Sequence, residues 1–176
     1  MKLSITQLQE IMPHAGRRAV LFFDPLVRAM AADGIDTDVR AAAFLAQIAH
    51  ESGELRYVRE LASGKAYEGR KDLGNTQPGD GERFRGRGLI QITGRANYKA
   101  AGEALGVNFI ENPALMELPI HAARVSTWFW KDRGLNIWAD KGDFRRLTIR
   151  INGGLNGFED RLEYWERAKR TLKVES

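Results

Sequence analysis

Two glutamates stand nine residues apart, Glu51 in AHES and Glu60 in RELAS, and both are candidates for acid–base chemistry. Hydrolysis of a glycosidic bond uses two carboxyl groups, one protonated to assist the leaving oxygen and one ionised to act on the opposite face. Glu51 follows a long apolar segment, which disfavours a charged carboxylate and suits the acid. Glu60 lies beside Arg59 in a polar segment, which suits the ionised base. Glu54 and Glu68 are rival candidates, and the pair could also be ordinary surface glutamates.

Other catalytic chemistries find little support in the sequence. His50-Glu51 resembles the start of the HExxH zinc motif, but Glu54 stands where the second histidine is required. The other histidines, His14 and His121, lie in unrelated segments, so we expect no metal ion and a structural role for His50. The absence of cysteine excludes disulfides and thiolate catalysis. Nucleophile-elbow, P-loop and dinucleotide-binding motifs are also missing, and we expect no cofactor.

The segment before Glu51 predicts a helix that delivers this carboxyl group. Thr37 or Asp38 can cap its N-terminus, and VRAAAFLAQIAHES leaves almost no polar face, which is typical of a buried central helix. If the helix continued to Glu60, its rise would separate the two carboxyl groups by about 13 Å, too far for either glycosidase mechanism. We therefore expect Gly53 to end the helix and the chain to fold Glu60 back toward Glu51.

Helical patterns dominate the rest of the chain, and the predicted fold class is mostly α. The stretch 61–88 is the exception, because it is dense in glycine and charge and has few apolar anchors. We expect a long irregular loop there, with a short strand pair around Tyr67 and Phe84 as the alternative. A loop of this length in a compact domain is usually functional or mobile. The other helices are expected at about residues 5–12, 19–32, 95–105, 119–134, 144–151 and 158–172.

Length and composition predict one folded domain over residues 1–176, with 43% hydrophobic and 28% charged residues. No apolar run approaches the roughly 20 residues that span a bilayer, so we expect no stable membrane insertion. The first residues, MKLSITQLQEIMPHAG, have no apolar core of the kind a secretory signal needs. We therefore expect a protein made in the cytoplasm without a cleaved signal.

A net charge of +4 favours a polyanionic partner, which could be nucleic acid, an anionic membrane or bacterial wall polymer. Four arginines, Arg83, Arg85, Arg87 and Arg95, are interpreted as a solvated or wall-binding face. Stacking aromatics are scarce among them, so we expect no nucleic-acid binding.

Several motifs in order resemble glycoside hydrolase family 19, the plant-type chitinases, and in particular the phage and prophage endolysins of that group. They are FLAQIAHES, then YEGRKDLGNTQPGDGERFRGRGLIQITGRANY, then WFW, and then INGG with a following arginine. The resemblance covers roughly residues 37–170. It implies a lysozyme-like, two-lobed fold with a substrate cleft, and hydrolysis with inversion.

The resemblance also implies roles for individual residues. Glu51 matches the general acid, and Glu60 matches the general base proposed for the endolysins. Thr93 stands where the family has a hydroxyl side chain that holds the attacking water. Tyr67, like Trp138, is an aromatic candidate for stacking on a sugar, with core packing the favoured alternative. Sugar-contacting positions are matched by Gln91, Asn97 and Asn152, and a buried arginine near the acid by Arg161.

The absence of the plant enzymes' cysteines and of several of their loops predicts a shorter cleft. The basic charge and the lack of a signal fit a phage-type lytic enzyme, so the β-1,4-linked glycan strands of peptidoglycan are favoured over chitin as substrate. Such an enzyme would act on the wall, in the periplasm, after a separate pore protein opens the membrane. We expect a monomer. Chitin hydrolysis and non-catalytic wall binding are the alternatives.

Overall fold

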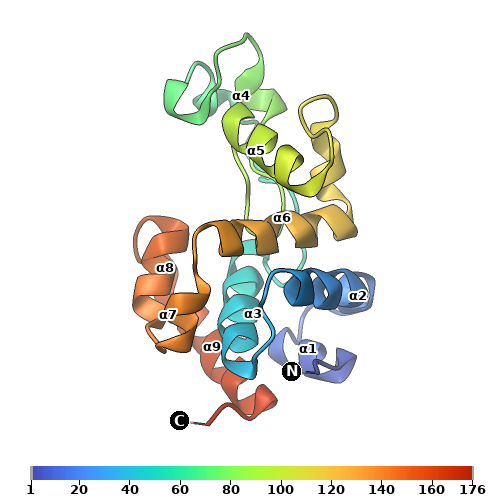
Figure 1. Cartoon of the computed structure of the whole chain (residues 1–176), viewed down its shortest axis with the longest axis vertical. Helices are drawn as coiled ribbons and strands as arrows, with labels where there is room; N and C mark the ends of the chain where they lie inside the picture. Colours follow the sequence, from blue (N-terminus) through green and yellow to red (C-terminus); the bar gives the residue numbers. More distant parts are fainter. Residues whose placement is uncertain (1, 176) are drawn as a thin grey trace.

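The computed structural model describes residues 2–175, so the ends of the predicted 1–176 domain, residues 1 and 176, lie outside the described part. Helices joined by turns make up this part of the chain (Figure 1). The α-helices are α1 (Ile5–Ile11), α2 (Arg17–Ala32), α3 (Asp38–Ser52), α4 (Asp80–Arg83), α5 (Arg95–Leu105), α6 (Pro119–Asp132), α7 (Asn136–Asp140), α8 (Phe144–Asn152) and α9 (Phe158–Leu172). Short 3-10 turns are η1 (Lys65–Tyr67), η2 (Lys71–Leu73) and η3 (Pro113–Glu117).

Helix α3 is the central element, as its sequence predicts. The Thr37 hydroxyl accepts a hydrogen bond from the Arg40 amide and caps the helix. Every residue from Ala41 to Ala49 is buried. Because α9 packs along α3 and other helices cover its remaining faces, an apolar surface on all sides is what this position requires (Figure 1).

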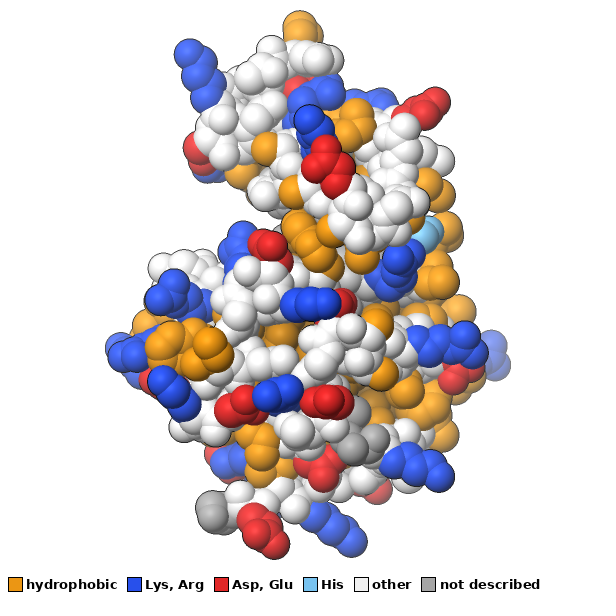
Figure 2. All heavy atoms as spheres, in the orientation of Figure 1, with side chains coloured by type: hydrophobic (Ala, Val, Ile, Leu, Met, Phe, Trp, Pro, Cys, Tyr) orange, Lys and Arg blue, Asp and Glu red, His pale blue; other side chains and the backbone are white. Residues whose placement is uncertain are grey.

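The helices form two lobes, which confirms the fold class expected from the sequence. One lobe holds α1–α3 and α7–α9, the other holds α4, α5 and the turns around them, and α6 lies between the two, in contact with α2 and with α5 (Figure 1). The smaller lobe has its own aromatic contact, because the rings of Phe84 and Tyr98 meet edge to face with centroids 5.1 Å apart. Figure 2 shows the surface hollowed between the two lobes.

The stretch 61–88 is irregular, as predicted, but the strand pair considered around Tyr67 and Phe84 is wrong. Tyr67 lies in η1, and Phe84 is the residue that ends α4. Pairing in this region is limited to isolated bridges of Arg87 with Arg59 and with Ile92. Side chains rather than a sheet satisfy the backbone here: the Glu68 carboxylate accepts from the amides of Gly79 and Gly81, each at 2.8 Å.

Helix α7 and turn η3 were not predicted, because each has five residues and too short an apolar pattern to detect. Along residues 2–175, no helix combines the length and the apolar character needed to cross a membrane.

Candidate active site

The end of α3 places Glu51 at the edge of the core. Gly53 follows in the left-handed region, with φ 56°, and its amide bonds to carbonyls of the last turn. Glu54 and Leu55 also have positive φ, at 56° and 65°, so the chain turns sharply over three consecutive residues. The predicted break after Ser52 is therefore confirmed, and it is stronger than a single glycine would give.

A buried arginine holds the Glu51 carboxylate. Arg161 of α9 is 1% exposed, and its Nη2 lies 2.7 Å from Oε1 of Glu51. Nη1 of the same guanidinium donates to Gln47 Oε1 at 2.6 Å, and the Gln47 amide donates to the Thr148 hydroxyl at 3.0 Å. Gln47 and Glu51 are one helical turn apart on α3, so one guanidinium contacts both. Arg161 thus lies where the resemblance places a buried arginine.

This contact corrects one expectation about Glu51. The sequence suggested apolar surroundings that disfavour a charged carboxylate, but the structure sets a guanidinium against it. The Glu51 carboxyl group therefore has a charged, buried partner on the side that faces α9.

The rival candidates, Glu54 and Glu68, have structural roles. Glu54 is 3% exposed, and its carboxylate accepts from the Tyr164 hydroxyl at 2.7 Å and from the amide of His14. Burial and Glu54 raise the pKa of Tyr164, which keeps this hydroxyl a donor. Glu54 thus joins the segment after α1 to α9, and Glu68 binds two loop amides while it remains exposed.

The second carboxylate, Glu60, is held by neutral donors from the loop. Its Oε2 accepts from the amide of Gly86 at 3.0 Å and from the hydroxyl of Tyr67 at 3.2 Å. Burial and the nearby Glu60 charge raise the pKa of Tyr67, so this hydroxyl stays protonated as a donor. Oε1 of Glu60 is buried and has no hydrogen-bond partner among the described residues. Hydrogen bonds to described residues therefore fix only one of the two carboxylate oxygens.

Three of the predicted sugar- and water-binding side chains line one hollow of about 320 Å³ between the lobes. Its walls come from the segment 91–93, from α5, from α6 and from Ile151 of α8. Within it, the Asn97 amide donates to the Thr93 carbonyl at 2.8 Å, which fixes the side chain of Asn97. The three predicted side chains that line the hollow are those of Gln91, Thr93 and Asn97. Gln91 and Thr93 are half-buried, and their side chains have polar atoms for contact with a ligand.

Gly86 joins this hollow to Glu60. A Cβ atom at Gly86 would lie 2.7 Å from Oε2 of Glu60 and 2.7 Å from Oε1 of Gln91. Both side chains therefore meet at one point of the backbone that only glycine leaves open. Gly86 was not among the predicted site residues, although its place between two arginines in FRGRG is a sequence signal for it.

Two more predicted residues are Asn152, at the end of α8, and Trp138, in α7. Asn152 is the last residue of α8, and its Nδ2 is buried with no hydrogen-bond partner among the described residues. Its neighbour Ile151 lines the hollow that Thr93 lines. Asn152 is therefore an unsatisfied donor beside this hollow, in keeping with a sugar-contacting role. Trp138, the other aromatic candidate, lies under Arg146 at 4.7 Å from the ring centroid, packed within the fold.

His50 has the structural role expected from the sequence. Its Nδ1 lies 2.6 Å from a carboxylate oxygen of Asp160, and its ring packs against Gly157, where any Cβ would collide with it. Residues 2–175 contain no group of three or more His, Asp or Glu side chains placed to hold a metal ion.

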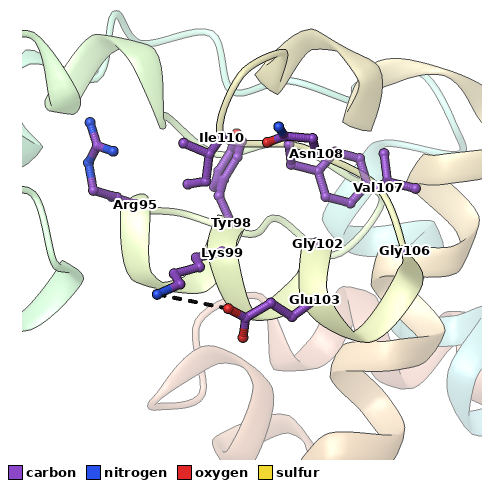
Figure 3. A pocket seen from close by; sticks show the side chains of 10 residues that line it. Arg95, Tyr98, Lys99, Gly102, Glu103, Gly106, Val107, Asn108 and Ile110 are labelled. Carbon is purple, nitrogen blue, oxygen red and sulfur yellow. Dashed lines mark ion pairs between the residues drawn. The ribbon is translucent and has the colours of Figure 1, made fainter.

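Another hollow, of about 620 Å³, lies on a different side of the small lobe, between α5 and the segment 106–110 (Figure 3). Figure 3 shows Lys99 and Glu103 side by side on α5, with an ion pair of 3.8 Å between them. Arg95 at its edge is bound to Asp80, at 2.8 Å. None of the residues predicted for the site lines this hollow, so we place the active site in the groove between the lobes.

The mostly helical, two-lobed fold, with Glu51 at the end of its core helix and Glu60 in the loop that follows, is that of a lysozyme-like glycoside hydrolase. The sequence profile described as chitinase class I, glycoside hydrolase family 19, matches residues 26–136. The chain therefore belongs to glycoside hydrolase family 19, and it is a chitinase-like enzyme that cleaves glycosidic bonds.

Relatives agree with this assignment. A family 19 domain-containing protein of Haemophilus influenzae is 29% identical over 196 residues, covering 94% of both chains. An endochitinase of Arabidopsis thaliana is 38% identical over 142 residues, which are 76% of this chain but 48% of the plant protein. Among solved structures, a bacterial family 19 chitinase has a TM-score of 0.81 at 28% identity, covering 98% of this chain and 95% of that one. Chitinase C of Streptomyces griseus has a TM-score of 0.80 at 26% identity, covering 97% and 76%.

Proposed function

We propose that this chain is an endolysin-type hydrolase that cleaves the β-1,4 bonds of peptidoglycan glycan strands with inversion. The observation that carries the proposal is the different state of the two carboxylates. Arg161 fixes Glu51 at the end of the core helix, whereas Glu60 keeps one oxygen without a partner. The first arrangement suits a group that returns to a stabilised carboxylate, and the second suits a group that takes a proton from water.

In this mechanism, Glu51 gives its proton to the glycosidic oxygen as the bond from that oxygen to the anomeric carbon breaks. A water molecule oriented by Thr93 attacks the same carbon from the opposite face, and its proton passes to Glu60. A new carbon–oxygen bond with inverted configuration results, and no covalent intermediate forms. Gln91, Asn97, Asn152 and Tyr67 would contact the sugars, and Arg161 would position Glu51.

Peptidoglycan is favoured because the chain carries a net charge of +4 and bacterial walls are rich in anionic groups. Chitin is the second candidate, since the plant relatives are named endochitinases and the similar solved structures are chitinases. The proposal also includes synthesis in the cytoplasm, a monomeric state, and passage to the periplasmic wall through a pore that another protein makes.

A digest of purified peptidoglycan, reduced with borohydride and read by mass spectrometry, tests the proposal. New reduced N-acetylmuramic acid or N-acetylglucosamine ends, absent with Glu51→Gln, are the expected result, and the sugar identifies the bond that is cut. Ends that appear equally with Glu51→Gln would refute the role of Glu51. Turnover of N-acetylglucosamine oligomers without any turnover of peptidoglycan would make the chain a chitinase. Binding to the wall without any product would favour the non-catalytic alternative.

A further inference from the structure

A second hollow, of about 270 Å³, contains Glu60 and is rich in arginine. Its lining includes Arg56, Arg59 and Arg85 together with the carboxylates of Glu60 and Glu117. The charged groups come from three separate parts of the chain: the turn after α3, the end of the long loop, and η3, which carries Glu117. The hollow is therefore assembled by the fold and is not the exposed face of one helix.

The arginines of this hollow differ in their partners. Glu117 is paired with Arg59 at 3.4 Å and with Arg87 at 3.6 Å. No carboxylate of residues 2–175 forms an ion pair with Arg56 or Arg85. Arg56, whose Cζ lies 5.3 Å from the centroid of the Tyr57 ring, and Arg85 therefore line the hollow beside Glu60 without a carboxylate partner among the described residues.

Arg85 in particular is held in place without an acceptor. Its side chain is half-buried, and its Nε is fully buried with no hydrogen-bond partner among the described residues. Its own carbonyl accepts from the hydroxyl of Tyr98, which anchors the backbone at this point. Because the half-buried side chain lines the hollow, a carboxylate there would form charge-assisted hydrogen bonds with the part of the guanidinium that faces the hollow.

A neutral glycan offers these two side chains no charged acceptor. Oligomers of N-acetylglucosamine have hydroxyl and amide groups but no anion. A glycan strand of peptidoglycan carries carboxylates, either on the lactyl ether of muramic acid or on the peptide attached to it. The Glu60 carboxylate lies in the same hollow, so a substrate positioned for the proposed reaction passes close to both arginines.

We propose that Arg56 and Arg85 bind a carboxylate of the substrate and so make the enzyme selective for carboxylated β-1,4 glycans over neutral ones. This inference rests on the proposed function, which it deepens by naming the groups that recognise the substrate. Both arginines would contribute affinity only when the glycan carries an anion, which is how a polar site discriminates between otherwise similar ligands.

The test compares Arg56→Gln and Arg85→Gln with the parent on three substrates. These are intact glycan strands with their peptides, strands stripped of peptide by an amidase so that the lactyl carboxylate is free, and N-acetylglucosamine oligomers. Each variant should lower kcat/KM on a carboxylated substrate by about tenfold or more, the worth of a charged hydrogen bond, and leave the neutral oligomers unaffected. Arg28→Gln, an exposed arginine of α2 that removes the same charge, is the matched control and should change neither.

The substrates on which kcat/KM falls show which group of the glycan the two arginines bind. A loss on stripped strands assigns the lactyl carboxylate, and a loss confined to intact strands assigns the peptide; both support the inference. Equal losses on all three substrates would show that the arginines act through Glu60, and no loss would show that they do not bind substrate; both overturn it. If the parent cleaves only neutral oligomers, the proposed function itself fails.

A binding measurement tests the inference independently of catalytic turnover. In the Glu51→Gln background, affinity for soluble carboxylated fragments should fall about tenfold when Arg56, the more exposed of the two, is replaced by glutamine. The affinity of the background protein for these fragments should also weaken as salt is raised, because the contact is ionic. Affinity that is equal for neutral and carboxylated fragments, and insensitive to salt, would overturn the inference even if both variants fold normally.

Discussion

Replacing Arg161 by glutamine removes the side chain that ties Glu51 to the core, and it should lower both stability and turnover. The guanidinium contacts Glu51 at 2.7 Å and Gln47 at 2.6 Å, and its Nε donates to the carbonyl of Asn156 at 3.2 Å. Glutamine is shorter and neutral, so it cannot replace all three contacts. Two buried or partly buried acceptors on α3 would lose their charged donor.

The size of the expected loss of stability follows from the burial of Arg161 and Glu51. Removing one partner of a buried ion pair costs about 3–5 kcal/mol, because the other charge is left without compensation. Glu51 is 24% exposed at its side chain and can regain some hydration, so we expect the lower end, about 3 kcal/mol. For a chain of this length, such a loss lowers the midpoint of thermal unfolding by about 6–12 °C.

Urea unfolding and thermal scans measure the loss of stability, and turnover is compared at a temperature where both proteins are folded. We expect kcat to fall by about 100-fold in the folded variant, since a carboxyl group displaced by about 1 Å loses its alignment with the bond. Arg161→Lys keeps the charge but not the planar geometry and should rescue only part of kcat. Arg170→Gln, an exposed arginine on the same helix, should change stability by at most about 0.5 kcal/mol.

A double-mutant cycle with Glu51→Gln separates the ion pair from the rest of the site. The two substitutions should be non-additive by about 1–3 kcal/mol in unfolding free energy. Additive effects, or a folded Arg161→Gln variant with the kcat of the parent, would refute the claim that this arginine positions the acid.

Three further sets of substitutions test the two candidate catalytic glutamates, the Asp80–Arg95 ion pair and the backbone at Gly86. Glu51→Gln should abolish cleavage of natural glycans yet spare an aryl glycoside whose leaving group needs no proton, whereas Glu60→Gln should abolish both; rate measurements on the two substrate types check this. Arg95 holds the pKa of the Asp80 carboxyl below its usual range, so the pair stabilises the fold above pH about 4 and loses this effect as pH falls through the lowered pKa. The destabilisation by Asp80→Asn, read from urea midpoints, should therefore be full at pH 7 and shrink toward pH 2. Gly86→Ala, whose Cβ would lie 2.7 Å from an oxygen of Glu60, should cut turnover about tenfold while the unfolding midpoint moves little.

The sequence was a good guide where apolar periodicity dominates. Helix α3 and its end at Gly53 follow from an apolar run, a capping threonine and a glycine, and α5 begins at Arg95 and ends at Leu105 as predicted. Local patterns suffice there because packing and propensity favour the same structure. The loop 61–88 was predicted only as irregular, because contacts distant in sequence, such as the Asn75 side chain accepting from the Arg95 amide, determine its turns.

The roles of neighbouring carboxylates could not be read from the sequence. Glu51 and Glu54 are separated by a single turn, and both follow the same apolar segment. The left-handed backbone at Glu54 turns its side chain toward the amide of His14, whereas Glu51 remains at the edge of the core. This difference depends on how three residues bend after α3 and on what α9 presents to them, and neither is encoded in a local pattern.

The two candidate catalytic groups are delivered by independent parts of the fold, and this separation has a chemical consequence. Glu51 belongs to a rigid helix and is fixed by a charged donor, so its position depends on the packing of α3 against α9. Glu60 belongs to a loop and is fixed by neutral donors at one oxygen only, so its position depends on Gly86 and Tyr67. Substitutions in the loop can therefore change the base and its surroundings without disturbing the acid. Substrate preference can in this way change through loop residues while the helix that carries the acid stays the same.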